Sequence, residues 1–273
     1  MQFNPVTKFN VASQHTRGGS RAAPRGHWTT IARRLPAARR RLRQLALLVG
    51  LLCAVAFTSP LYATVRETLI ELQDGGTVKV FIFEPDNHGD GPWPLSILMA
   101  GGGGNEYVAR AQFWLGQELA NQGWLIAVPV SPTANYFAGE NDHRIPEVIS
   151  QLQTHSSISG QKALLVGVST GGSFALELAA RQPELYYGVV AAPGMLKDLS
   201  IIKDMKQLPV YLRIGERDSF RWDRSMPALV QALEEAGAQV NARLVPRGQH
   251  IFRMNWDNLR PWLDSLRHEH SDR

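Results

Sequence analysis

Residues 167–171 of this 273-residue chain read G-V-S-T-G, which fits the pattern G-x-S-x-G of a nucleophilic serine. An apolar run over 163–168 leads into Ser169, and a helical pattern begins directly after it. A serine on a sharp turn between a strand and a helix projects its hydroxyl above the sheet. Glycines two residues away on either side leave room for the strand and the helix to approach each other. The pattern therefore favours a nucleophile at Ser169 over a plain Gly/Ser-rich connection.

Two more residues with catalytic chemistry follow predicted strands later in the chain. The strand expected at 210–214 leads into G-E-R-D, which ends at Asp218, and the strand expected at 240–245 leads into P-R-G-Q-H, which ends at His250. Ligands of such sheets bind beyond the carboxyl ends of the strands. A serine, an aspartate and a histidine therefore occur in that order, each just past a strand end, and a fourth strand runs into four glycines.

This order resembles that of the α/β-hydrolases, and residues 64–273 are similar throughout to the small secreted esterases of that superfamily, which have little or no lid. The resemblance implies that Ser169 is the nucleophile and that His250 is the general base that takes its proton. It also implies that Asp218 orients the imidazole and stabilises its charged form. No cofactor is implied.

The resemblance further implies an oxyanion hole, in which two backbone N–H groups stabilise the negative charge of the tetrahedral intermediate. One donor would be Thr170, and the other would come from the loop after the third strand. Many esterases have His-Gly at the start of this loop, whereas this chain has Ala-Gly at 100–101. The second donor is therefore left open among Gly101, Gly102 and Gly103, and Gly102 is preferred.

Two other acids, Glu216 and Asp223, also follow the strand at 210–214 and compete with Asp218. Asp218 is four residues past the strand, a suitable reach for a carboxylate in a loop that turns toward the histidine. Glu216 comes earlier and has a longer side chain, and Asp223 is expected to cap the following helix. Asp218 is preferred as the triad acid, and it could also cap the segment that follows it.

The other candidate groups have simpler explanations. His143 and His155 compete with His250, but both precede the serine and so depart from the order Ser…Asp…His. The glycine run is not followed by Gly-Lys-Ser/Thr, which disfavours a nucleotide phosphate loop. The loop at 86–90 contains His88 and two aspartates but is typical of a solvated turn, so that neither a metal site nor a cofactor is expected.

Hydrophobic patterning after residue 64 predicts an α/β fold. An antiparallel hairpin is expected from 65–72 and 77–83, which D-G-G joins. Strands and helices then alternate at short spacing, which predicts a mostly parallel central sheet with helices on both faces. The expected strands are 95–100, 124–130, 163–168, 186–192, 210–214 and 240–245, and the expected helices are 107–121, 142–154, the segment after 169, 226–236 and 255–266. The connection at 193–208, where large lids are often inserted, is short, so that a minimal lid is expected.

The function that these residues predict best is hydrolysis of carboxylic esters through an acyl-serine. An open site suits short acyl esters or the end of a larger polymer or glycan ester. Tyr136, Phe137, Phe220 and Trp222 could line the cleft, although core or rim packing explains each equally well. Two other functions stay open: a serine peptidase of the prolyl-oligopeptidase type reduced to its catalytic domain, and a binding protein on a non-catalytic hydrolase fold. The oligomeric state is not predicted.

The net charge of +5 arises in the first 63 residues, which carry one lysine and nine arginines but no acidic residue. The other 210 residues carry 19 basic and 24 acidic side chains, a net charge of about −5. A mildly acidic body argues against a general nucleic-acid surface.

Residues 1–63 have the order of a secretory signal and are expected to form a segment separate from the hydrolase domain at 64–273. A basic block at 33–43 precedes an apolar run at 45–57, and small residues at 59–63 offer a cleavage site. Export to the periplasm or the medium is expected, with membrane contact only through this signal, and tethering by an uncleaved segment is the alternative. Cys53, the only cysteine, lies in the apolar run, so that the mature chain would contain no disulfide.

Overall fold

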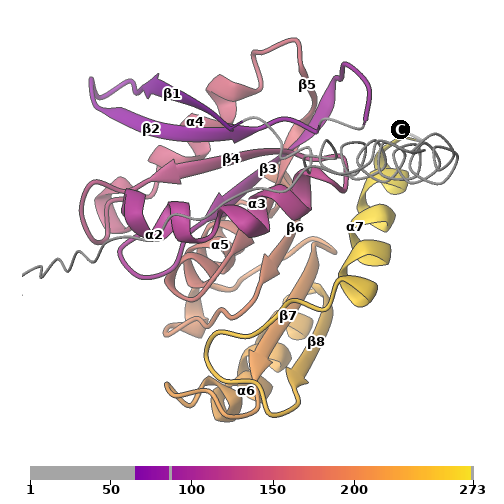
Figure 1. Ribbon diagram of the computed structural model, residues 1–273. Helices are drawn as coiled ribbons and strands as arrows, with labels where there is room; N and C mark the ends of the chain where they lie inside the picture. Colours follow the sequence, from indigo (N-terminus) through magenta and orange to yellow (C-terminus); the bar gives the residue numbers. More distant parts are fainter. Residues whose placement is uncertain (1–64, 86–87, 272–273) are drawn as a thin grey trace, which may run out of the picture. The chain divides into compact units, whose positions relative to one another are not determined.

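The computed structural model describes residues 65–85 and 88–271 (Figure 1). The chain divides into two units, Met1–Ser59 and Pro60–Arg273, and all described residues belong to the second. The predicted signal segment at 1–63, with Cys53, lies outside the described residues, as does Asp86. Within the described part, no helix combines the length and the apolar character that crossing a bilayer requires.

An eight-stranded sheet with the order β1-β2-β4-β3-β5-β6-β7-β8 forms the centre of the described domain (Figure 1). The first two strands form the predicted antiparallel hairpin, β2 also pairs antiparallel with β4, and all later pairs are parallel. The predicted mostly parallel sheet with an N-terminal hairpin is thus confirmed. The strands are β1 (Val65–Glu71), β2 (Thr77–Phe83), β3 (Trp93–Met99), β4 (Leu125–Val130), β5 (Ile158–Gly167), β6 (Tyr186–Ala191), β7 (Pro209–Gly215) and β8 (Gln239–Val245).

Helices cover both faces of this sheet, because its central strands are apolar on both sides. Successive residues of β3 belong to different cores: Ile97 packs into one cluster and Leu98 into the other. Helices α4 (Arg144–Leu152), α5 (Thr170–Arg181) and α6 (Trp222–Glu235) contribute to the first core, whereas α2 (Glu106–Ala111), α3 (Phe113–Ala120) and α7 (Trp256–Ser271) contribute to the second. Both cores are continuous from β2 to β7, which makes the sheet a rigid support for the loops at its edge.

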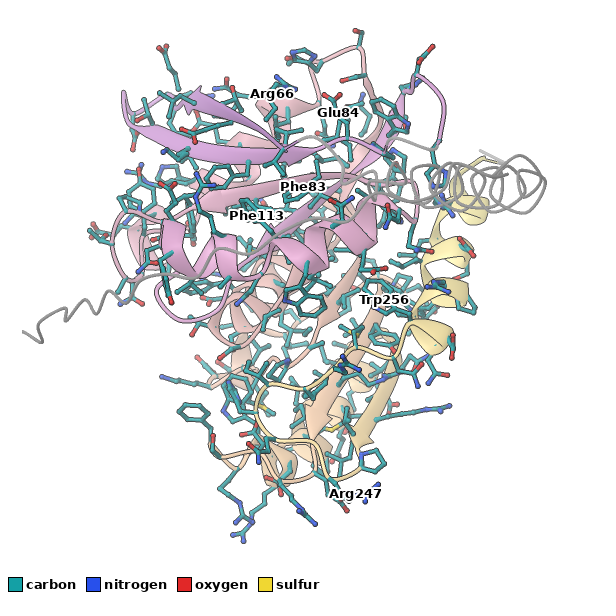
Figure 2. All side chains as sticks on the ribbon, viewed as in Figure 1. Arg66, Phe83, Glu84, Phe113, Arg247 and Trp256 are labelled. Atoms are coloured by element: carbon teal, nitrogen blue, oxygen red, sulfur yellow. The ribbon has the colours of Figure 1, made fainter. Side chains whose placement is uncertain are left out.

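The single helix predicted at 107–121 is wrong, because the chain forms two helices that meet at Gln112. Gln112 leaves the helical region, with φ −107° and ψ 9°. The break lets the Phe113 ring pack edge-on against Phe83 (Figure 2). It packs in the same way against Phe81, and the ring centroids are 5.0 Å apart in each pair. Packing against distant residues therefore decides where this helix is interrupted, and the local hydrophobic pattern of the sequence does not predict the interruption.

The predicted start of α6 at residue 226 is also wrong, since the helix begins four residues earlier, at Trp222. Asp218 accepts a hydrogen bond from the Phe220 N–H, and the Trp222 N–H lies 3.5 Å from the same oxygen. Arg221 takes a left-handed conformation directly before the helix, with φ +61°. This turn, which the Asp218 carboxylate holds, sets the start of α6.

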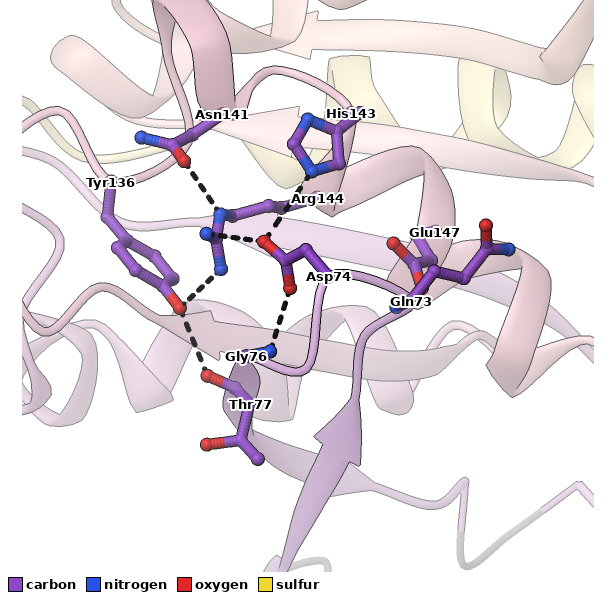
Figure 3. Close-up of polar contacts among 9 residues, drawn as sticks. All are labelled: Gln73, Asp74, Gly76, Thr77, Tyr136, Asn141, His143, Arg144 and Glu147. Atoms are coloured by element: carbon purple, nitrogen blue, oxygen red, sulfur yellow. Dashed lines mark hydrogen bonds and ion pairs between the residues drawn. The ribbon is translucent and has the colours of Figure 1, made fainter.

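A polar cluster ties the β1–β2 turn to the loop before α4 (Figure 3). Arg144 donates hydrogen bonds to Asp74 Oδ2, to the Tyr136 hydroxyl and to Asn141 Oδ1, at 2.7, 2.7 and 2.9 Å. The Tyr136 hydroxyl in turn donates to the Thr77 carbonyl at 3.1 Å. The hydroxyl of Tyr136 is therefore occupied in holding the hairpin, a role that the sequence did not suggest.

Candidate active site

Ser169 occupies the turn between β5 and α5 in a strained backbone conformation, with φ +57° and ψ −118°. Such a conformation persists in a non-glycine residue only where the surroundings impose it. Here two glycines bring the backbones very close together: a Cβ atom on Gly167 would lie 2.2 Å from the Gly171 carbonyl oxygen, and one on Gly171 would lie 2.1 Å from that of Met99. The two flanking glycines of G-x-S-x-G are therefore required, because any side chain there would collide with neighbouring backbone.

Replacing Gly171 by alanine is expected to destabilise the fold by about 3 kcal/mol, because the added Cβ atom collides with backbone that has no room to move. The clash involves the carbonyl oxygens of Met99 and Ala100, at 2.1 and 2.6 Å. Urea unfolding followed by circular dichroism measures the change. Gly103→Ala is the matched control, since its new methyl group meets no atom closer than 3.8 Å. Equal urea midpoints for Gly171→Ala and the wild type would contradict this account of the turn.

The structure brings Ser169, His250 and Asp218 into one hydrogen-bonded row. Ser169 Oγ lies 2.7 Å from His250 Nε2, and His250 Nδ1 lies 2.7 Å from Asp218 Oδ2. The Asp218 side chain has no exposed surface, and that of His250 is 14% exposed. The serine end of the row therefore faces the surface, while the carboxylate end is sealed.

The two other acids that follow β7 have different partners. Glu216 Oε2 accepts the Arg247 N–H at 2.7 Å, and Asp223 Oδ1 lies 3.6 Å from Arg221 Nε. Of the three competing acids, Asp218 is the one that contacts His250.

The loops that carry Asp218 and His250 meet because β7 and β8 are neighbours in the sheet. The Arg217 N–H donates to the Gly248 carbonyl at 2.7 Å, which joins the two loops directly. A Cβ atom on Gly215 would lie 2.0 Å from the Gln249 carbonyl oxygen, so that only glycine permits this approach. Arg247, on the second loop, lies at the end of the domain in Figure 2.

Two backbone segments border Ser169: the start of α5 and the glycine loop after β3. Thr170 begins α5, so that its N–H has no partner within the helix. Gly101 lies beside the serine, since a Cβ atom there would be 3.3 Å from Ser169 Cβ. Among the described residues, the N–H groups of Gly101, Gly102 and Gly103 donate no backbone hydrogen bond. Thr170 and Gly102 as oxyanion donors stay predictions.

The four aromatic residues expected near the cleft have different surroundings. The Trp222 and Phe220 rings contact the His250 imidazole, with centroids 5.0 and 4.6 Å away. Phe137 is buried in the first core, and Tyr136 packs against that core while its hydroxyl binds Arg144. Trp222 and Phe220 are therefore the pair at the candidate site.

Two histidines that compete with His250 lie elsewhere. His143 Nε2 is 3.9 Å from Asp74 Oδ2 at the hairpin turn (Figure 3). His155 lines a surface cavity with Arg66 and Gln151. Among the described residues, no group of three or more His, Cys, Asp or Glu side chains has the arrangement of a metal site.

Gln112 is a site neighbour that the sequence did not indicate. Its Nε2 would lie 3.4 Å from a Cβ atom on Gly101, and its Oε1 is buried without a hydrogen-bond partner among the described residues. The break between α2 and α3 directs this amide toward the glycine loop. A residue inside a continuous helix, as predicted, would give no reason to expect this contact.

The fold and the arrangement of the site define an α/β-hydrolase. The model of the Dienelactone hydrolase family matches residues 133–261, a span that contains Ser169, Asp218 and His250. No curated protein matches the chain at a significant level.

Solved structures share the fold at low sequence identity. A candidate dipeptidyl aminopeptidase IV from Bacteroides ovatus has a TM-score of 0.65 and 13% identity over 78% of this chain, which spans only 36% of that protein. The dienelactone hydrolase-like promiscuous phosphotriesterase P91 from metagenomic libraries has a TM-score of 0.60 and 16% identity, over 76% of this chain and 97% of its own. An S-formylglutathione hydrolase from Agrobacterium tumefaciens has a TM-score of 0.59 and 13% identity, over 79% of this chain and 97% of its own. The likeness shows the fold.

Proposed function

We propose that this protein is a serine hydrolase that cleaves carboxylic esters through an acyl-enzyme. The observation that carries the proposal is the row from Ser169 Oγ through the His250 ring to the sealed Asp218 carboxylate, with both distances at 2.7 Å. A hydroxyl, an imidazole and a carboxylate in this order are the groups that nucleophilic acyl transfer needs.

The chemistry begins with transfer of the Ser169 proton to His250 Nε2 as the oxygen attacks the ester carbonyl. Asp218 accepts the hydrogen bond from Nδ1, so that Nε2 is left free to accept the proton, and its negative charge stabilises the imidazolium. Backbone N–H groups of Thr170 and the glycine loop would stabilise the oxyanion, each worth roughly 3 kcal/mol in comparable sites. Water then hydrolyses the acyl-serine by the reverse proton transfers.

Small-molecule esters and the ends of polymer or glycan esters are the proposed substrates. The connection between β6 and β7 is short and includes one turn of 3₁₀-helix (Leu199–Ile201), which is too little chain for a large lid. The proposal includes no nucleic-acid partner. The match to the Dienelactone hydrolase family supports an ester substrate, because a lactone is a cyclic ester.

A serine peptidase is the second candidate, because a dipeptidyl aminopeptidase candidate is among the structural neighbours. Both functions use the same three side chains, so that substrate assays must separate them. Hydrolysis of p-nitrophenyl acetate and butyrate, without hydrolysis of aminoacyl-anilides, supports the esterase. The opposite result supports the peptidase, and inactivity on both supports a non-catalytic binding protein.

Export is proposed from the basic block and apolar run at 33–57. Protein purified from its native source is expected to begin near Phe57 or Thr64 in N-terminal sequencing. A cytoplasmic product that keeps the arginines at 33–43 would overturn the proposal, and a membrane-bound product that keeps the apolar run would favour tethering.

A further inference from the structure

The loop that carries the triad acid also places two aromatic rings against the base. Phe220 lies 4.6 Å from the His250 ring at an interplanar angle of 66°, and Trp222 lies 5.0 Å from it at 77°. The two rings also contact each other, with centroids 6.0 Å apart. The imidazole is therefore flanked by aromatic surface that comes from residues two and four positions after Asp218.

These two rings differ in what they present to a ligand. Trp222 is partly buried and packs against the first core, where it supports the imidazole from the protein side. Phe220 is 66% exposed, and Ile251, the residue after His250, is 60% exposed. Burial of a large apolar side chain away from water is favourable. Packing within the protein therefore does not explain why Phe220 and Ile251 expose apolar surface next to His250.

Phe220 is held in place although it is exposed. Its backbone N–H donates to Asp218 Oδ1 at 2.7 Å, and the other oxygen of that carboxylate binds His250. The backbone at Phe220 is therefore held by the same buried carboxylate that binds the imidazole, and the phenyl ring lies against the rings of His250 and Trp222. A surface that is ordered before binding loses little conformational entropy when a ligand contacts it.

The reaction determines which part of an ester would contact this surface. Acylation forms the bond between the acyl carbon and Ser169 Oγ and breaks the bond between the acyl carbon and the alcohol oxygen. His250 Nε2 takes the serine proton and gives it to that alcohol oxygen. The leaving oxygen must therefore come within hydrogen-bond distance of Nε2, and the group attached to it must lie against the surroundings of the imidazole.

We propose that Phe220 is a specificity-determining residue that binds the alcohol part of the substrate, and that the preferred substrates are esters of apolar, ring-containing alcohols. The inference rests on the ester hydrolysis proposed above and adds the substrate class. An aromatic alcohol group would stack or pack edge-on against the exposed phenyl ring and gain both apolar burial and ring contact.

The test varies the alcohol while the acyl group stays the same. Benzyl acetate and ethyl acetate release alcohols of similar basicity, so that a difference in kcat/KM between them reports binding of the ring. Phe220→Ala is expected to lower kcat/KM for benzyl acetate about tenfold more than for ethyl acetate, and Phe220→Leu less than that. Ethyl phenylacetate, which has the ring on the acyl side, is expected to follow ethyl acetate.

Leu185→Ala is the matched control, because Leu185 is also an exposed apolar residue, at 36%, but directly precedes the amino end of β6, opposite the site. It is expected to leave the preference for benzyl acetate unchanged. Circular dichroism and the rate of fluorophosphonate labelling check that the Phe220 variants keep their fold and an accessible serine.

A binding measurement separates this inference from the proposed function. NMR titration of the Ser169→Ala protein with benzyl acetate gives a Kd without turnover, and adding Phe220→Ala is expected to raise that Kd about tenfold. If the wild type hydrolyses no ester, the proposed function fails, and the titration still decides the role of Phe220. Equal Kd values, or equal losses of kcat/KM for benzyl and ethyl acetate, would overturn the inference.

Discussion

Ser169→Ala is expected to lower kcat for p-nitrophenyl butyrate on the order of 10⁶-fold, to the level that binding and backbone donors alone provide. The reason is that the hydroxyl 2.7 Å from His250 Nε2 is the atom that the proposed mechanism acylates. The turn at Ser169, with φ +57°, directs this side chain above the sheet. Steady-state assays measure the loss, and covalent labelling by a fluorophosphonate probe is expected to disappear with it.

Ser173→Ala provides a matched control one helical turn further along α5. Ser173 Oγ accepts the Met195 N–H at 3.2 Å, whereas the hydrogen bonds of the His250 ring go to Ser169 and Asp218. Its loss is expected to cost about 1 kcal/mol of stability at most and to leave labelling intact. Labelling that persists in a folded Ser169→Ala protein would refute the nucleophile assignment, whatever the fate of the other residues.

The arrangement of the sheet is largely predictable because each strand carries a local signal. The central strands are apolar runs bounded by glycine, proline or polar residues, and they are buried on both faces. Their alternation with helices forces parallel pairing through short crossovers, which brings the strand ends to one edge. The three residues at those ends therefore come together even though 81 positions separate Ser169 from His250.

The parts that sequence patterns miss depend on contacts between distant segments. Gln112 interrupts a helix because the Phe113 ring packs between Phe81 and Phe83, about thirty residues earlier in the chain. The Tyr136 hydroxyl binds Arg144, which in turn pairs with Asp74, 70 positions away. Neither contact changes the periodic pattern of apolar and polar residues from which helices and strands are predicted. A residue such as Tyr136, which looks available for a ligand in the sequence, is therefore committed elsewhere in the fold.

The choice of the triad acid depends partly on a pattern that the sequence shows and partly on contacts that it does not show. Counting positions after the strand favours Asp218 over Glu216 and Asp223, but it cannot show where the competing side chains are engaged. In the structure Glu216 binds the Arg247 N–H, and Asp223 lies in the first turn of α6 near Arg221. Both acids have a local structural explanation, whereas Asp218 joins the base to the start of α6. Removing the charge of each carboxylate in turn is therefore expected to change kcat by different amounts.

Asp218→Asn is expected to lower kcat on the order of 10⁴-fold with the fold retained. The amide oxygen can still accept the Phe220 N–H, but an amide N–H facing His250 Nδ1 selects the tautomer that carries its proton on Nε2. That nitrogen then cannot accept the serine proton. Glu216→Gln and Asp223→Asn change the same charge within five residues of Asp218, and each is expected to change kcat by about threefold or less. Side-by-side kcat measurements on the three purified variants, with circular dichroism to confirm folding, decide the matter. A large loss of kcat in Asp223→Asn, together with a kcat near the wild-type value in Asp218→Asn, would show that a different carboxylate orients the base.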